Sequence, residues 1–322
     1  CALPIYWKCY PHNYYRFGLY KKDKQLSKEE ILDYIPEFFF YEILLPYCGN
    51  YKKAVLIEDK NMLEILFRSI NIKQPVTICK LIKNSLFNVN MQKIDFNLVI
   101  KNLIDSEFKK IFIKPYNGKG GNGVYVFTRE NGIYKNSNNI VFDSEFLEQI
   151  GKDTDYIIQG GIKQYKELNQ MYPHSVNTFR IITENKNGNI RILGSGLRVG
   201  KAGNQVDNFS QGGIYLSVDI ETGMIVSDGI LDADEYIVKH PDTGFFFKGY
   251  KLPFWNEVKE FTLECASKLP QITYLGWDIA MSTDGPLAIE TNIRYGIGFS
   301  ELRSIYKIKD PKYYYKNRGE RK

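Results

Sequence analysis

The chain has 322 residues and a mass of 37.5 kDa, which is long enough for two or three packed subdomains. Hydrophobic residues make up 43% of it and charged residues 25%, so disordered and fibrous classes of protein are excluded. No apolar run reaches the roughly 18 residues that a membrane helix needs, and the first residues lack the regions of a secretory signal. We therefore expect a globular, cytoplasmic protein without a membrane span.

Charge and the rarer residue types narrow the function classes further. The formal net charge is +6, but residues 307–322 hold seven Lys or Arg against two acidic residues, so the body is nearly neutral. This argues against a nucleic-acid partner, and the basic, Tyr-rich tail is typical of a solvated end or of a weak contact with an anionic glycan or lipid-linked acceptor. Five scattered cysteines and three unclustered histidines argue against a disulfide framework, a Cys/His zinc site and a His-based triad.

The first part of the chain, up to about residue 105, is predicted to be mostly helical. Ser27 and Glu30 have the spacing of a capping box. Asp59 and Asp95 can each cap a further helix. The apolar face expected after Asp59 consists of Met62, Leu63, Leu66 and Ile70.

After residue 109 the pattern changes to short β-rich runs separated by Asn-Gly and Thr-Gly turns. One further helix is expected over 256–268, followed by a hairpin of strands 274–281 and 286–292. The predicted fold class is α+β. We expect a helical, acceptor-side region at 1–105, a small lobe at 106–161, a large lobe at 162–306 and a basic tail at 307–322.

A glycine-rich segment, residues 114–123, lies between two predicted strands. Its spacing fits G-x-G-x-x-G, but a dinucleotide fold requires a helix directly after the loop, and here a strand follows. A glycine loop between strands is instead typical of a flap whose amides close over phosphate, with Lys114 adding a charge. The alternative interpretation is a plain hairpin with an exposed lysine.

Three oxygen-bearing side chains are predicted to converge on the final hairpin. Glu290 and Asn292 are two residues apart on one strand and share a face. A turn near Asp284 places Asp278 opposite Glu290, within one residue of register. Oxygen ligands without His or Cys suit Mg²⁺. The alternative is carboxylates on the solvated face of an ordinary hairpin.

Arginines also lie on predicted strands, at Arg180, Arg198 and Arg294, and Asn208 lies in a polar loop. Arginines that face a carboxylate–metal site would stabilise a transferring phosphoryl group. Surface ion pairs are the alternative for each arginine taken singly.

Together and in this order, these motifs resemble the ATP-grasp superfamily, and most of all its sugar-transfer-associated branch. The resemblance covers residues 55 to 300. It includes Asp59-Lys60, the Lys114-Pro115 segment with the glycine loop, Gln159 to Ile162, Asn177 to Arg180, the Asp207-Asn208 loop, Asp278 and Glu290 to Asn292. Gln159 departs from the pattern, because many relatives have Glu there.

The resemblance implies a nucleotide cleft between two α+β lobes, and it assigns roles to individual residues. Lys60, Lys114 and Lys119 would contact phosphates, and Gly120, Gly121 and Gly123 would cover them. Gln159, Gly160 and Ile162 would bind the base. Asp278, Glu290 and Asn292 would hold one or two Mg²⁺, and Lys114, Arg180, Arg198 and Asn208 would act at the phosphoryl group or the acceptor.

The implied reaction is carboxylate–amine ligation with ATP through an acylphosphate, in the assembly or modification of a surface polysaccharide such as a capsule. The expected partners are a small-molecule or glycan-linked carboxylate and an amine. Two alternatives remain: a kinase of the same fold that phosphorylates a hydroxyl, and a nucleotide- or glycan-binding pseudoenzyme.

Overall fold

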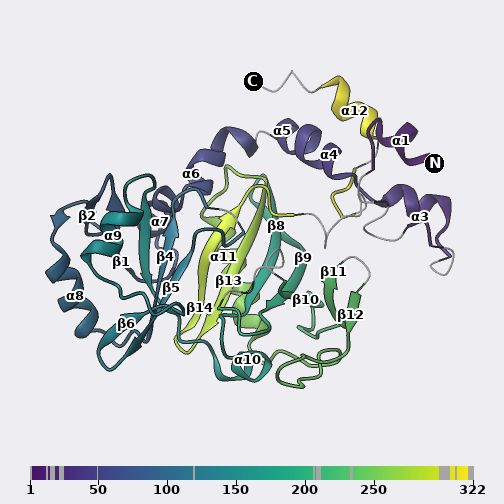
Figure 1. Cartoon of the computed structure of the whole chain (residues 1–322). Coiled ribbons are helices and arrows are strands. Elements are labelled where there is room, and N and C mark those ends of the chain that lie inside the picture. The colour runs from purple at the N-terminus through teal and green to yellow at the C-terminus, as the bar shows by residue number, and fades with distance from the viewer. Residues whose placement is uncertain are drawn as a thin grey trace.

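The computed structural model describes residues 2–11, 14, 19–21, 25–48, 50–118, 120–205, 207, 212–232, 235–296, 305–308 and 310–317. It has three parts: a small lobe, a large lobe, and a helical region built from the first described helices and from residues 311–316 (Figure 1). Each lobe is built on one seven-stranded antiparallel sheet. The expected α+β class is therefore confirmed.

The small lobe contains a sheet of order β3-β2-β1-β7-β4-β5-β6. Its strands are β1 Thr77–Ile82, β2 Ser85–Phe87, β3 Lys93–Ile94, β4 Lys110–Pro115, β5 Tyr125–Glu130, β6 Ile133–Lys135 and β7 Tyr156–Gly160. Helices α8 (Phe96–Ile104) and α9 (Ser144–Ile150) pack against it and share a separate apolar core with it. Asp95 caps α8 as predicted, by accepting from the backbone of Leu98.

Three of these strands lie in the segment that was expected to be mostly helical, and there the prediction was wrong. Lys83 and Asn84 form the two-residue turn between β1 and β2, and both have positive φ values (46° and 58°). Two-residue hairpin turns of this kind usually contain glycine. Lys83-Asn84 contains none, so the sequence did not indicate a hairpin here. β1 is completed by pairing with β7, more than seventy residues away, which local patterns cannot show.

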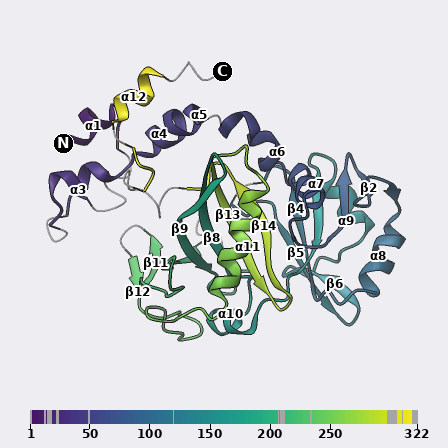
Figure 2. The ribbon, with the colours of Figure 1, turned by 180° about the vertical axis from the view of Figure 1, so that it is seen from behind.

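The large lobe contains a sheet of order β12-β11-β10-β9-β8-β13-β14. Its strands are β8 Thr178–Lys186, β9 Asn189–Val199, β10 Ile214–Ser217, β11 Gly229–Asp232, β12 Glu235–Ile237, β13 Tyr274–Ser282 and β14 Gly285–Asn292. Helix α11 (Trp255–Ser267), which the sequence predicts within one residue at each end, lies against one face (Figure 2). The short helix α10 (Lys166–Met171) follows the small lobe's last strand.

Helix α7 (Lys60–Ser69) follows α6 (Ala54–Glu58) and contacts both lobes. Asp59 caps α7 as predicted, accepting from two backbone amides at 2.9 Å. The predicted apolar face is wrong at one position, since Met62 is 46% exposed and Glu64 is buried instead. Phe67 stacks on Trp277 of the large lobe, while Glu64 pairs with Lys80 of the small lobe at 2.6 Å. A helix between two lobes buries two faces, so a single apolar stripe does not describe it.

The helical region consists of short segments: α1 Ala2–Trp7, α3 Lys28–Asp33, α4 Glu37–Phe39, the π-helix η2 Phe40–Leu44, α5 Leu45–Tyr47, η3 Asn50–Lys53 and α12 Pro311–Lys316. The predicted capping box of Ser27 and Glu30 is present at α3. Helix α12 lies beside α1 in both views (Figures 1 and 2), and Tyr315 donates to the carbonyl of Trp7 at 2.9 Å. Within residues 311–316 of the basic tail, Pro311 is buried and Tyr314 and Tyr315 are partly buried, whereas Lys312, Tyr313 and Lys316 are exposed. No helix among the described residues is long and apolar enough to span a membrane.

Candidate active site

The register of the large sheet brings the predicted charged residues into one row. Arg180 on β8 lies directly opposite Asp278 on β13, and Asp278 lies opposite Glu290 on β14. The side chains of directly opposed residues in an antiparallel pair project from the same face. The predicted pairing of Asp278 with Glu290 is confirmed, and the register shifts by one residue directly beside it, between Asp278 and Ile279.

Asp278 is held by two arginines. Arg180 binds its carboxylate through two nitrogens, with Nε–Oδ1 at 2.7 Å and Nη2–Oδ2 at 3.2 Å. Arg198 approaches the same carboxylate with Nη2–Oδ2 at 3.1 Å. Burial alone would raise the pKa of Asp278, but the two guanidinium groups outweigh it and lower this pKa. Asp278 is therefore an anion even without a ligand.

Glu290 is partly buried, and its environment is less favourable to charge. Burial and the neighbouring negative charge of Asp278 both raise the pKa of Glu290. Asn292, on the same face of β14, donates to Glu290 Oε1 at 3.3 Å. A cation placed here would relieve the repulsion between the two carboxylates, and its ligands would be the oxygens that Mg²⁺ prefers. Asp278, Glu290 and Asn292 thus fit Mg²⁺, although the described residues contain no cluster of three acidic, His or Cys side chains.

A second buried carboxylate, Asp207, was not singled out from the sequence. It accepts from the backbone nitrogen of Thr178 at 2.9 Å and from the Thr178 hydroxyl, and it lies 3.7 Å from Arg198 Nε. Burial raises the pKa of Asp207. Its neighbour Asn208, which the resemblance marks as catalytic, lies outside the described residues.

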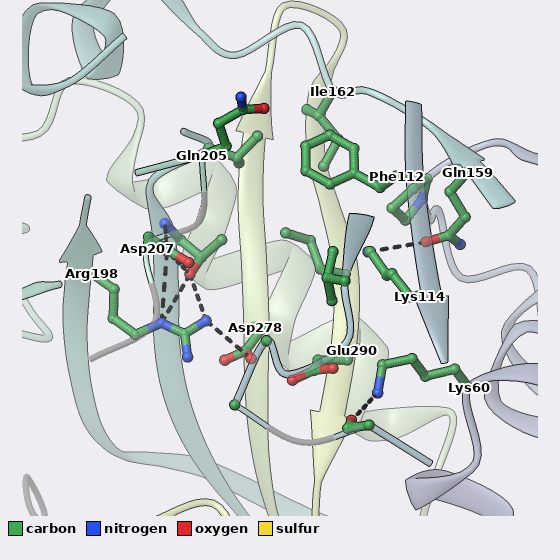
Figure 3. Close-up of a pocket in the computed structure, with 18 of the residues that line it drawn as sticks. Lys60, Phe112, Lys114, Gln159, Ile162, Arg198, Gln205, Asp207, Asp278 and Glu290 are labelled. Atoms are coloured by element: carbon green, nitrogen blue, oxygen red, sulfur yellow. Dashed lines mark hydrogen bonds and ion pairs between the residues drawn. The ribbon is translucent and has the colours of Figure 1, made fainter. Parts of the chain in front are cut away.

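The small lobe supplies the opposite wall, mainly from β4 and β7. Lys114 points from β4 toward Gln159 on β7 and donates to its Oε1 at 3.1 Å (Figure 3). Burial lowers the pKa of Lys114 to about 8, because the described residues place no carboxylate within ion-pair distance of it. Phe112, Gly160 and Ile162 continue this wall with apolar surface.

The glycine segment after β4 forms the edge of the site. Gly120, Gly121 and Gly123 have φ values of 63°, 79° and 72°, which side chains with a Cβ rarely adopt. Lys60, the first residue of α7, donates from Nζ to the carbonyl of Gly118. Gly118, Gly120 and Gly121 line the cavity, whereas Gly123 shapes the turn behind it. Lys119 lies outside the described residues.

These walls line a cavity of about 120 Å³ between the lobes, which is open to solvent on one side (Figure 3). Of the predicted site residues, the cavity is lined by Lys60, Lys114, Gly120, Gly121, Gln159, Gly160, Ile162, Arg198, Asp278 and Glu290. Arg180 and Asn292 contact these carboxylates from just outside the lining.

The cavity is also lined by residues to which the sequence analysis assigned no role: Phe112, Val176, Thr178, Gln205, Asp207 and Ile289. Among them Gln205 faces the cavity, and its buried Oε1 has no hydrogen-bond partner among the described residues (Figure 3). Asp207 directly precedes Asn208, which was predicted to be in the site. Its position beside that residue is the feature of the sequence that could have identified it.

Comparison with solved structures finds similar folds at low identity. The biotin carboxylase domain of Hydrogenobacter thermophilus 2-oxoglutarate carboxylase has a TM-score of 0.44 and 11% identity, over 84% of this chain and 47% of that one. D-alanine–D-alanine ligase from Bacillus anthracis, complexed with ATP, has a TM-score of 0.39 and 17% sequence identity, over 74% of this chain and 55% of that one. D-alanyl-alanine synthetase A from Vibrio cholerae has a TM-score of 0.43 and 10% sequence identity, over 82% of this chain and 63% of that one. The chain spans about half the length of the first two.

A comparison with curated proteins found no match. Among protein families, the model described as sugar-transfer associated ATP-grasp matches residues 44–307. This match covers most of the chain, including both sheets and every element that lines the cavity. The chain therefore belongs to the sugar-transfer associated ATP-grasp family.

Proposed function

We propose that the protein is an ATP- and Mg²⁺-dependent ligase that joins a carboxylate to an amine, in the assembly or modification of a surface polysaccharide. The observation that carries this proposal is the pairing of two unlike walls across one cavity. Lys60 and Lys114 stand on one side, and Asp278 and Glu290 on the other. A nucleoside triphosphate bound with a divalent cation is complementary to both.

On the small-lobe side, Lys60 and Lys114 would bind phosphate oxygens with charge-assisted hydrogen bonds. Each now donates to a neutral acceptor, the carbonyl of Gly118 and the amide of Gln159. Phosphate would replace these neutral acceptors with charged ones. The flap glycines have backbone amides that can turn toward the same phosphates.

On the large-lobe side, Asp278, Glu290 and Asn292 would hold Mg²⁺, one or two ions. When bound, the ion neutralises phosphate charge and polarises the γ-phosphoryl group. Arg180 would keep Asp278 oriented through its two-point contact, since both nitrogens are already engaged. Arg198, next to Asp207 and Asp278, would face the transferring group or the acceptor.

Ligation fits the side chains available. The described residues that line the cavity include no Ser, Cys or His, and the Thr178 hydroxyl is bound to Asp207. The phosphoryl group would therefore pass directly to a bound substrate. A substrate carboxylate oxygen attacks the γ-phosphorus as the bond to ADP breaks, and the amine then attacks the acyl carbon and releases phosphate. Positioning and charge neutralisation would supply the catalysis.

Asp207 supports one alternative, a kinase acting on a hydroxyl. It is a buried carboxylate at the cavity wall with a raised pKa, a property that suits a general base. In that reaction the substrate hydroxyl would give its proton to Asp207 and take the γ-phosphoryl group, and the reaction would end there.

Hydroxylamine trapping separates these reactions. Purified protein is incubated with Mg-ATP, candidate sugar acids or amino acids, and hydroxylamine, and hydroxamate is measured with ADP. Ligase chemistry should give hydroxamate that depends on the carboxylate, whereas a kinase gives a stable phosphate ester and no hydroxamate. ADP formation that is absent with every acceptor, together with intact nucleotide binding, would instead favour a pseudoenzyme. The same assay is run on Lys114→Met, which removes a proposed phosphate ligand. Lys101→Met, at an exposed position of α8, is its matched control.

A further inference from the structure

A second groove, of about 450 Å³, opens directly beside the nucleotide cavity. The two spaces share three residues, Phe112, Ile162 and Val176. Figure 3 shows Phe112 and Ile162 at one end of the nucleotide cavity and Asp278 and Glu290 toward the other. The groove therefore adjoins the end that lies away from the carboxylates, and a molecule in it would not receive the phosphoryl group.

The charges that line the groove are mostly positive and uncompensated. Lys109, Lys110 and Lys163 line it together with a single acidic residue, Glu107. Within the described parts of the chain, none of these three lysines forms an ion pair, because every ion pair found there involves other residues. Because residues 1–306 together have a net charge close to zero, these three lysines are a local concentration of positive charge.

Lys110 is the most constrained of the three lysines. It is partly buried, and its Nζ donates to the carbonyl of His174 at 3.0 Å. Burial lowers the pKa of Lys110, because a carbonyl group does not replace the water that the ammonium group loses. An anion beside this ammonium group would compensate for that loss.

The floor of the groove is rigid and polar. Gln164 is buried, and its amide nitrogen donates to Asn169 Oδ1 at 2.9 Å and to the carbonyls of Tyr172 and Ser175 at 3.2 Å. Its Oε1 accepts from the backbone nitrogen of Asn177 at 2.5 Å. Gln164 is therefore already satisfied, whereas the buried Ser175 hydroxyl, which also lines the groove, has no hydrogen-bond partner among the described residues. The lysines are the charged groups available to a ligand.

We propose that this groove is a second binding site, for a small anion with a phosphate or carboxylate group, occupied together with the nucleotide. The anion would lie among Lys109, Lys110 and Lys163 and take hydrogen bonds from their ammonium groups. The site goes beyond the proposed ligase function, since it is separate from the carboxylates and from the phosphate-binding lysines.

Calorimetric titration tests the site on the full-length chain saturated with Mg²⁺ and the β,γ-imido analogue of ATP, so that the nucleotide cavity is blocked. Inorganic phosphate and glucuronate are titrated separately at low ionic strength, which distinguishes a phosphate from a carboxylate ligand. Lys110→Met and Lys163→Met keep the length of the side chain and remove its charge. Lys101→Met removes an exposed lysine elsewhere on the small lobe and controls for net charge.

The proposal expects saturable binding of one of the two anions, weakened about tenfold by Lys110→Met and less by Lys163→Met, with Lys101→Met unchanged. Lys110→Arg should restore the binding, which excludes misfolding as the cause. Absence of binding to the unmodified chain, or equal weakening by Lys110→Met and Lys101→Met, overturns the proposal. So does a loss of nucleotide affinity in Lys110→Met, because the groove would then be part of the nucleotide site. Nucleotide affinity is measured separately, so failure here leaves the ligase proposal standing.

Discussion

The two walls of the cavity treat their buried charges in opposite ways. On the large lobe, Arg180 and Arg198 compensate Asp278, and Arg198 also approaches Asp207. On the small lobe, Lys114 lies partly buried beside the neutral amide of Gln159. The large-lobe wall is thus organised by its own ion pairs, whereas on the small-lobe wall Lys114 has no carboxylate within ion-pair distance among the described residues.

The small lobe contains its own contrast to Lys114. Lys80 on β1 is fully buried, and Glu64 compensates it at 2.6 Å. Two lysines of one sheet therefore differ in whether the fold supplies a carboxylate. A compensated buried lysine indicates a structural role, and an uncompensated one at a cavity indicates ligand binding.

The largest expected effect is on the large-lobe wall. Asp278→Asn removes the shared carboxylate and leaves two arginines nearly buried without it. Breaking such a buried pair costs about 3–5 kcal/mol. The urea midpoint of unfolding should fall strongly. A midpoint equal to that of the unmodified chain would show that this wall is not stabilised by charge compensation.

Lys80→Met should lower the free energy of unfolding by about 3 kcal/mol, at the low end of the range for a broken buried pair, because Arg68 still contacts Glu64 at 3.2 Å. Lys114→Met should leave the urea midpoint unchanged or raise it, since it removes a poorly compensated charge. The two variants make the same substitution in the same sheet. Equal destabilisation by both would remove the distinction between them.

For nucleotide affinity the order of the two variants should be reversed, with a larger effect for Lys114→Met than for Lys80→Met. Lys114→Met should weaken binding of the Mg²⁺–imido-ATP complex about tenfold or more, the worth of a charge-assisted hydrogen bond. Calorimetry or fluorescence titration measures this, with Lys101→Met as control. Retention of full affinity in Lys114→Met would contradict its assignment as a phosphate ligand.

The lowered pKa of Lys114 gives opposite pH dependences for binding and stability. Above its pKa of about 8 the folded chain loses this proton. Nucleotide affinity should therefore fall as the pH rises through 8. The unfolded chain keeps the proton up to the ordinary lysine pKa, so the contribution of Lys114 to stability rises with pH over the same interval. Both trends should be absent in Lys114→Met.

The smallest effect on stability is expected for Glu290→Gln. Because burial and Asp278 raise the pKa of Glu290, its charge destabilises the folded chain at neutral pH, and its neutral isostere should unfold at an equal or slightly higher urea concentration. Asn292→Asp should instead add charge to the same face. Both should change the Mg²⁺ dependence of ATP turnover, and unchanged Mg²⁺ titrations in both would show that the metal lies elsewhere.

Much of the site could be predicted because its signals are local. Glu290 and Asn292 are two positions apart, so their side chains lie on one face of any strand, and a turn near Asp284 sets the partner of Glu290. Positive φ at the flap requires glycine or a strained residue, so the glycines mark the loop. Asp59 stands directly before the helix whose amides it caps.

The rest depends on contacts between segments far apart in the sequence. That Arg180 and Arg198 share Asp278 follows from the strand order β9-β8-β13, which no local pattern contains. Asp207 and Gln205 reach the cavity from a loop whose path is set by the strands around it. The strand β1, residues 77–82, likewise depends on pairing with β7, and β2 and β3 follow it in the sheet.

The sequence by itself determined which side chains could bind phosphate and magnesium, because charge, glycine content and spacing are properties of the chain. Only the tertiary structure decided which of these charges are compensated, since compensation depends on distances across the sheets and between the lobes. Lys80 and Lys114 are both lysines on buried strands of one sheet. The fold brings a carboxylate to Lys80 and leaves Lys114 facing a cavity.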